Sequence, residues 1–204
     1  MSWQEIRNSL FQVCGSLLEP HGYRFVSARA GYERASTSER RGVYLVLVAS
    51  PHGNHSVQPW CGVRNNTIEK IFHRTSGVDK RYQSSYTTIN VGEGHWYLNT
   101  REEQQHAAAK LREFIQGVAL PFLGKEYSYR DYSALLNTDR DGRCPFHGNA
   151  ENRCHYGLIA AKLSGDPRFE ELKRQYSDFL RRTNRGFYYP RFEEFLKDID
   201  GQIF

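Results

Sequence analysis

The residues best suited to metal chemistry lie close together in the C-terminal third of the chain. Cys144 and His147 are separated by two residues, and Cys154 and His155 follow after a six-residue gap. Thiolates and imidazoles are the usual ligands of zinc, and four of them could close around one ion. Against a zinc site, Cys154 and His155 are adjacent, and the gap is shorter than in common zinc modules. The alternative is two cysteines beside solvent-facing histidines, and no metal or cofactor is predicted.

A neighbouring acidic stretch imitates the first half of a calcium-binding loop. It reads Asn137-Thr-Asp139-Arg-Asp141-Gly142. A calcium loop that begins at Asn137 requires a bidentate glutamate at its twelfth position, which here is Gly148. Aspartate and glycine are also common turn residues. The stretch is therefore predicted to be a turn.

A basic and aromatic segment, residues 181–191, is the best candidate for contacts with a partner. It combines four arginines with Phe187, Tyr188 and Tyr189. Such side chains stack on bases and bind phosphates, and they are also enriched at the energetic centres of protein interfaces. The third alternative is a basic helix end followed by a loop that simply packs. The residues predicted to contact a partner are Arg182, Arg185, Tyr188, Tyr189 and Arg191.

No sequence pattern specifies a catalytic centre. The chain has no Gly-x-Ser-x-Gly elbow, no phosphate-binding lysine loop and no His-Glu-x-x-His motif. His52, His55 and His95 lie near predicted strand ends, where a site could form, but solvated loop histidines are the more common case. We therefore predict no catalytic residue and expect a protein that is not an enzyme.

Composition and charge favour a globular protein whose partner is an acidic protein or a nucleic acid. The 204 residues are 39% hydrophobic and 25% charged, and the net charge is +5 with a pI of about 9.0. Aromatic residues reach 14%, which is more than a core strictly needs. The chain shows no signal peptide and no apolar run of the roughly 18 residues that span a bilayer. Its four cysteines are few, and the chain is predicted to be cytoplasmic with reduced thiols.

The elements that would position these residues are organised around residues 43–49. This run is almost entirely apolar and rich in valine, which predicts a central strand buried on both faces. Alternating segments flank it, and the one at residues 56–63 contains Pro59, which favours an edge strand or a bulge. Capping boxes at Ser2 with Glu5 and at Thr100 with Glu103 predict two amphipathic helices.

From about residue 128 the pattern becomes helix and loop only. Asp166 is predicted to cap a helix whose first residue is Pro167. The predicted fold class is α+β, with a mostly antiparallel sheet of four to five strands covered by helices. The predicted domains are an α+β core at residues 1–127 and a helical C-terminal part at residues 128–204 that packs on it.

The order of these features resembles a group of small bacterial α+β proteins. The resemblance covers a capped helix, Gly22-Tyr-Arg-Phe25 entering a strand, the apolar central strand, His95-Trp96 after the last strand, and a helix that ends near Leu120-Pro-Phe-Leu123. The group is a domain-of-unknown-function family (DUF4304-type) with relatives among the immunity proteins of polymorphic toxin systems. No catalytic motif carries over, and the stretch from Cys144 to His155 does not map onto the family.

The resemblance implies a non-enzymatic protein-binding module. The expected function is that of a cytosolic immunity protein that binds and neutralises a cognate bacterial toxin. The alternative function is an enzyme or zinc-containing protein that acts on nucleic acid. Neither function implies a membrane partner.

Overall fold

The computed structural model describes residues 2–50, 54–75, 83, 87–138 and 144–201, without the side chains of residues 184 and 185. Most of the predicted calcium-like turn lies outside these ranges. The sequence also predicts a strand at residues 82–91 from alternating side chains; residues 82 and 84–86 lie outside these ranges, and the structure places strand β5 at Ile89–Gly92.

The α+β prediction is confirmed. The sheet has the strand order β1-β2-β3-β4-β5, and β6 pairs with β4. The strands are β1 (Arg24–Val26), β2 (Gly31–Ala35), β3 (Glu39–Val48), β4 (Ser56–Asn65), β5 (Ile89–Gly92) and β6 (Trp96–Tyr97). The helices are α1 (Trp3–Leu18), α2 (Asn66–Thr75), α4 (Arg101–Phe114), α5 (Leu120–Gly124), α6 (Tyr129–Leu136), α7 (Ala150–Ser164), α8 (Phe169–Arg182) and α9 (Tyr189–Gly201). The C-terminal third is helical, as predicted.

The chain divides into two compact units. Unit 1 comprises Met1–Val63 and Val91–Lys125, and unit 2 comprises Arg64–Asn90 and Glu126–Phe204. Residues 64–90, which precede the second half of unit 1 in the chain, therefore belong with the C-terminal helices. Each unit is described by itself below.

Strand β3 has the central position that the sequence predicts, but only its middle, residues 42–45, is buried. It lies between β2 and β4, and Val43, Tyr44 and Leu45 are buried. The side chains of Val46 and Val48 are 46% and 50% exposed, so the prediction of burial on both faces is wrong for this end of the strand. An apolar run reports the composition of a strand, whereas burial depends on which distant elements cover it.

Strand β4 is not an edge strand. It has β3 on one side and β5 on the other, so the edge interpretation of Pro59 is wrong. Proline has no N–H to donate, but its carbonyl still accepts a hydrogen bond, here from the Glu93 backbone N–H at 3.2 Å. The neighbouring Trp60 stacks on Tyr44 at a centroid distance of 4.3 Å, which links β4 to β3 through their side chains.

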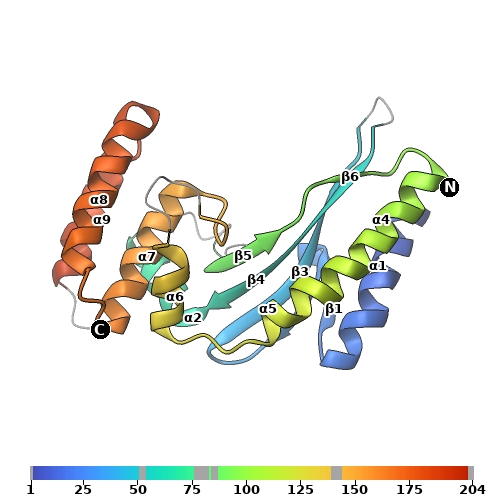
Figure 1. Cartoon of the computed structure of the whole chain (residues 1–204), viewed down its shortest axis with the longest axis horizontal. Coiled ribbons are helices and arrows are strands. Elements are labelled where there is room, and N and C mark those ends of the chain that lie inside the picture. Colours follow the sequence, from blue (N-terminus) through green and yellow to red (C-terminus); the bar gives the residue numbers. More distant parts are fainter. Residues whose placement is uncertain (1, 51–53, 76–82, 84–86, 139–143, 202–204) are drawn as a thin grey trace. The chain divides into compact units, whose positions relative to one another are not determined.

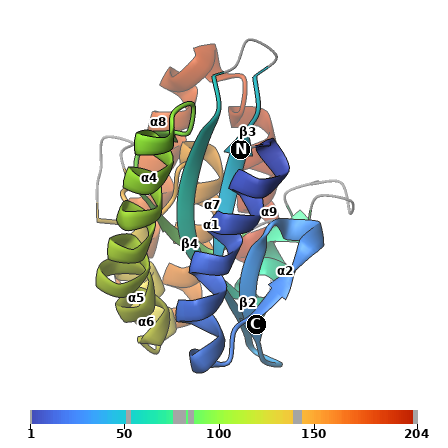
Figure 2. The same cartoon turned by 90° about the vertical axis from the view of Figure 1, so that its right-hand side faces the viewer.

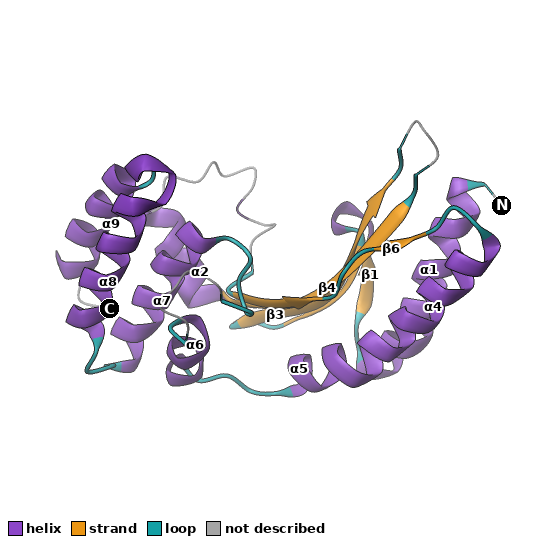
Figure 3. Ribbon diagram, turned by 45° about the horizontal axis from the view of Figure 1, so that its top comes forward, coloured by secondary structure: helices purple, strands orange, loops and turns teal. Residues whose placement is uncertain are grey.

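In unit 1, α1 and α4 lie side by side along one face of the sheet. Figure 1 and Figure 2 both show the pair, and Figure 3 shows the two helices on the same side of the orange strands. Both predicted capping boxes are confirmed, with Ser2 and Glu5 opening α1 and Thr100 and Glu103 opening α4. These caps fix where α4 begins and hence which of its side chains stand beside β6.

In unit 2, α7 is the central helix. It contacts α6, α8, α2 and α9, and it is buried on most of its circumference, with Leu158 and Ile159 fully buried. The terminal helices α8 and α9 lie side by side (Figure 1). Helix α8 begins at Phe169 with Arg168 at its cap position, so the prediction that Asp166 caps it is wrong.

The reason is that Asp166 has other partners. Its carboxylate accepts hydrogen bonds from the backbone and guanidinium of Arg168 and from the Ser133 hydroxyl of α6 at 2.9 Å. These bonds, led by the one from the Arg168 side chain, hold the pKa of Asp166 well below its usual range. Asp166 therefore ties α6 to the α7–α8 connection instead of opening α8.

Candidate functional site

The predicted partner segment forms the connection between α8 and α9 in unit 2. Phe187 is 77% exposed, more than any other large hydrophobic residue of the described part, and its ring meets that of Tyr188 edge-on at 5.1 Å. The guanidinium of Arg181 lies 4.4 Å from the ring centroid of Tyr189 and donates a hydrogen bond to the Tyr189 hydroxyl at 2.5 Å. Arginine and aromatic side chains thus share one short surface segment.

The five predicted contact residues differ in how the structure places them. Arg182 is exposed, and its Nε donates to the backbone carbonyl of Asp178 at 3.1 Å. Arg191 is exposed on α9, where its charge opposes the rise that burial causes in the pKa of Glu151. Tyr188 and Tyr189 are partly exposed, and the side chain of Arg185 lies outside the described part. No finding tests whether these residues bind a partner, so the assignment stays a prediction.

The cysteines and histidines weighed as zinc ligands in the C-terminal third have other partners. The Cys144 thiol donates to the Leu135 carbonyl, and the Cys154 thiol donates to the Ala150 carbonyl in its own helix. His147 lies beside Asn149, and its Nδ1 accepts from the Asn149 backbone N–H at 3.2 Å. Across the described ranges, no three His, Cys, Asp or Glu side chains are grouped as metal ligands.

His155 belongs to an aromatic cluster in the core of unit 2. Its ring lies 4.6 Å from Phe195, 5.2 Å from Phe192 and 5.8 Å from Phe72 between centroids. Its Nδ1 donates to the Glu151 carbonyl at 3.0 Å, and its buried Nε2 has no hydrogen-bond partner among the described residues. Burial lowers the pKa of His155 to about 4, so the imidazole is neutral at physiological pH.

A buried carboxylate, Glu69, is the polar centre of unit 2, and no sequence pattern indicates it. Oε1 accepts from the Thr88 hydroxyl at 2.9 Å, and Oε2 accepts from the Tyr156 hydroxyl at 3.0 Å. Arg64 and His73 also approach Oε2, at 3.2 and 3.1 Å. Since Glu69 is fully buried and both oxygens are occupied, it has no free position from which to take a substrate proton. The arrangement is that of a structural network.

Three of the four cysteines are equally unsuited to nucleophilic chemistry. All four are buried and unpaired with one another. Burial raises the pKa of Cys14, Cys61 and Cys154 to about 12. The nucleophile in cysteine chemistry is the thiolate, which these three do not form at neutral pH.

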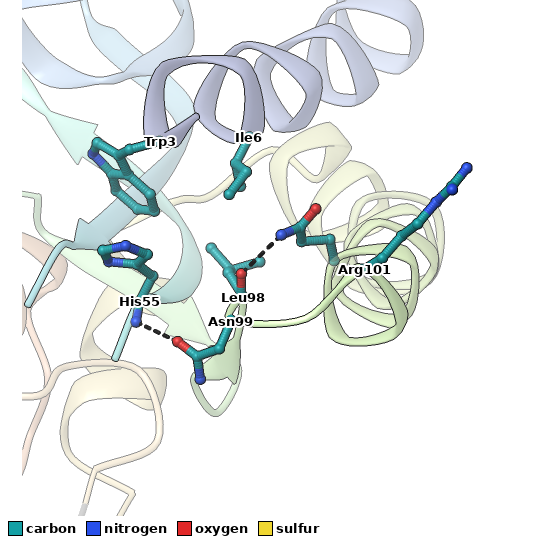
Figure 4. A pocket seen from close by; sticks show the side chains of 7 residues that line it. Trp3, Ile6, His55, Leu98, Asn99 and Arg101 are labelled. Carbon is teal, nitrogen blue, oxygen red and sulfur yellow. Dashed lines mark hydrogen bonds between the residues drawn. The ribbon is translucent and has the colours of Figure 1, made fainter. Parts of the chain in front are cut away.

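Unit 1 contains a cavity of about 570 Å³ beside the N-terminal ends of α1 and α4 (Figure 4). Its walls are Trp3, Ile6, His55, Leu98, Asn99, Arg101 and Gln104. Trp3 lies over the His55 ring at 4.7 Å, and the Nδ1 of His55 is buried with no hydrogen-bond partner in the described part. The Asn99 side chain accepts from the His55 backbone at 2.7 Å, while the Arg101 side chain points out of the cavity (Figure 4).

A second hollow in unit 1, of about 390 Å³, lies where β6 meets the first turns of α4. We call it the β6–α4 groove, and it is lined by His95, Trp96, Tyr97, Glu102, Glu103 and His106. Tyr97 is 54% exposed, and its ring meets that of His95 at 90° and 5.6 Å. Sequence analysis missed this groove, although the i, i+4 spacing of Glu102 and His106 places both on one face of α4.

Comparison of the chain with protein-family profiles, curated proteins and solved structures finds no match. The resemblance to the bacterial family therefore stays a prediction. Among the described helices, none combines the length and the apolar character that crossing a membrane requires.

Proposed function

We propose that the protein is a non-enzymatic protein-binding module, and most concretely a cytosolic immunity protein that binds and neutralises a cognate bacterial toxin. The observation that carries the protein-binding part is the α8–α9 connection, where the 77% exposed ring of Phe187 lies beside Tyr188. A large ring left in water gains free energy when a partner covers it. The toxin part rests on the family resemblance.

The arginines of the same segment indicate the character of the partner surface. Arg181, Arg182 and Arg191 accompany the exposed rings, and the whole chain carries a net charge of +5. Electrostatic complementarity favours a partner with an acidic surface, because opposite charges raise the association rate. A stable complex of this kind buries about 1,200–2,000 Å² in total. Both carboxylate oxygens of Glu69 already accept hydrogen bonds, and the cysteines are buried, which supports a role without catalysis.

The test is capture of the partner from a lysate of the native cell with wild type and with Arg182→Ala/Phe187→Ala. The matched control is Arg24→Ala/Phe25→Ala, which removes the same two residue types from β1, where Arg24 is exposed and Phe25 is 44% exposed. We expect the first variant alone to lose the partner. Equal capture by both variants, with their circular dichroism unchanged, would show that the α8–α9 connection is not the interface.

The salt response separates this function from the nucleic-acid alternative. Binding to nucleic acid through several arginines weakens by orders of magnitude between about 50 and 200 mM salt, because counterions are released. A packed protein interface loses far less, mainly through its association rate. The captured protein should also be toxic when expressed alone and harmless when co-expressed with this chain. Absence of such toxicity would remove the toxin part and leave the protein-binding part.

A further inference from the structure

The β6–α4 groove combines aromatic rings with carboxylates, and none of its described lining residues is a lysine or arginine. Trp96 and Tyr97 come from β6, and Glu102 and Glu103 come from the first turn of α4. Aromatic faces attract cations that lie within about 6 Å of the ring centroid, and carboxylates add direct charge attraction. Arg101, the nearest arginine in sequence, lines the other cavity of unit 1. The lining is therefore complementary to an organic cation.

The two carboxylates have different roles. Glu103 caps α4, accepting from the backbone N–H groups of Asn99 at 2.7 Å and Thr100 at 3.0 Å. Glu102 is exposed and makes no hydrogen bond or ion pair with any described residue. The positive end of a helix amounts to only about half a charge, so two carboxylates leave this end of α4 negative. Glu102 is the side chain that remains available to a ligand.

We propose that the β6–α4 groove receives an arginine or lysine side chain of a partner protein. The groove is open to solvent, so a side chain carried on a partner's surface suits it better than a free small molecule does. His95, Tyr97, Glu102 and His106 are all exposed, whereas small-molecule sites bury about 70–90% of their ligand. A guanidinium or ammonium group would lie against Trp96 and Tyr97 with Glu102 as its counter-charge. This inference rests on the protein-binding part of the proposed function and places a second contact in unit 1.

The test uses small probes, so its outcome is independent of partner capture. N-acetylarginine methylamide is titrated at pH 8 and low salt, and N-acetylcitrulline methylamide serves as the probe of the same shape without charge. The readout is the indole N–H resonance of Trp96 in a ¹H–¹⁵N spectrum, assigned by its loss in Trp96→Phe. The chain has only three tryptophans, so Trp3 and Trp60 are internal references.

We expect a saturable shift of the Trp96 resonance with the arginine probe and none with the citrulline probe. Removal of the Glu102 charge in Glu102→Gln should weaken binding by about fivefold or more, since one charge pair near 4 Å in water is equivalent to about 1 kcal/mol. Tyr97→Leu, which keeps apolar area but removes the aromatic face, should also weaken binding. Glu113→Gln removes an exposed carboxylate from the same helix and should bind as wild type does.

Four results would each overturn the proposal in a well-dispersed, folded sample. They are equal shifts with the two probes, no saturable shift at all, wild-type affinity in Glu102→Gln, and loss of binding in Glu113→Gln. A titration with choline tests the source of the cation. If choline bound more tightly than the arginine probe, the groove would be a site for a quaternary ammonium compound and not for a protein side chain.

Discussion

Replacement of His155 by phenylalanine should make the protein more tolerant of mild acid. In the folded protein His155 is 1% exposed and surrounded by Phe72, Phe192 and Phe195, and burial lowers its pKa to about 4. In the unfolded chain a histidine titrates near the ordinary value of 6.5. Between pH 6.5 and pH 4 the unfolded state therefore binds more protons than the folded state, and stability falls as the pH falls.

The magnitude follows from these two pKa values. At pH 5 the unfolded histidine is almost fully protonated and the folded one is about nine-tenths neutral, which lowers the free energy of unfolding by about 2 kcal/mol. At pH 7 the same effect is close to zero, because the histidine is mostly neutral in both states. His147, whose pKa burial also lowers to about 4, should contribute a similar loss. Between pH 7 and pH 5 the free energy of unfolding of wild type should therefore fall by about 4 kcal/mol through these two histidines. That of His155→Phe should fall by only about 2 kcal/mol, through His147 alone.

The assay is urea unfolding at pH 7 and at pH 5, followed by circular dichroism at 222 nm and by tryptophan fluorescence. All three tryptophans lie in unit 1, so a transition confined to unit 2 would appear in circular dichroism alone. The readout is the difference between the free energies of unfolding at pH 7 and at pH 5. Any packing cost of the larger phenylalanine ring is the same at both pH values and cancels in this difference. Phe72→Leu is the control, because it changes packing beside His155 without removing a titrating group. The reasoning is refuted if His155→Phe loses as much stability on acidification as wild type and Phe72→Leu do.

Two further substitutions test the core of unit 2, and a third tests an exposed glycine of unit 1. Tyr156→Phe removes a hydrogen bond of 3.0 Å to the buried Glu69 carboxylate and should lower the free energy of unfolding by about 1.5–3 kcal/mol. If urea unfolding shows a change below about 0.5 kcal/mol, the bond has no role in stability. Gly157→Ala should cost about 1–3 kcal/mol, because its new methyl group would collide with Oδ1 of the buried Asn137. Gly117→Ala, where the methyl group meets open space, should be neutral or stabilising by up to about 1 kcal/mol in the same assay.

Local sequence patterns determined the parts of this fold in which partners are close along the chain. The capping boxes at Ser2 and Thr100 specify where α1 and α4 begin, because both partners lie within one helical turn. The change to helices after residue 128 and the central position of β3 were likewise predictable from spacing and composition. The candidate segment at residues 181–191 was found in the same way, from residue types that are adjacent in sequence.

Tertiary structure decided the features whose partners are distant in sequence. Asp166 precedes a proline in the pattern of a helix cap, yet its carboxylate accepts a hydrogen bond from the hydroxyl of Ser133, 33 residues earlier. Glu69 lies on the short helix α2, and its buried carboxylate is satisfied by partners that include Tyr156, 87 residues later. The same holds for the exposed end of β3 and for the β6–α4 groove. Periodicity shows which residues share a face of an element, but the packing of the whole unit decides what covers that face. A buried polar group is tolerated only where hydrogen-bond partners, often distant in sequence, satisfy it.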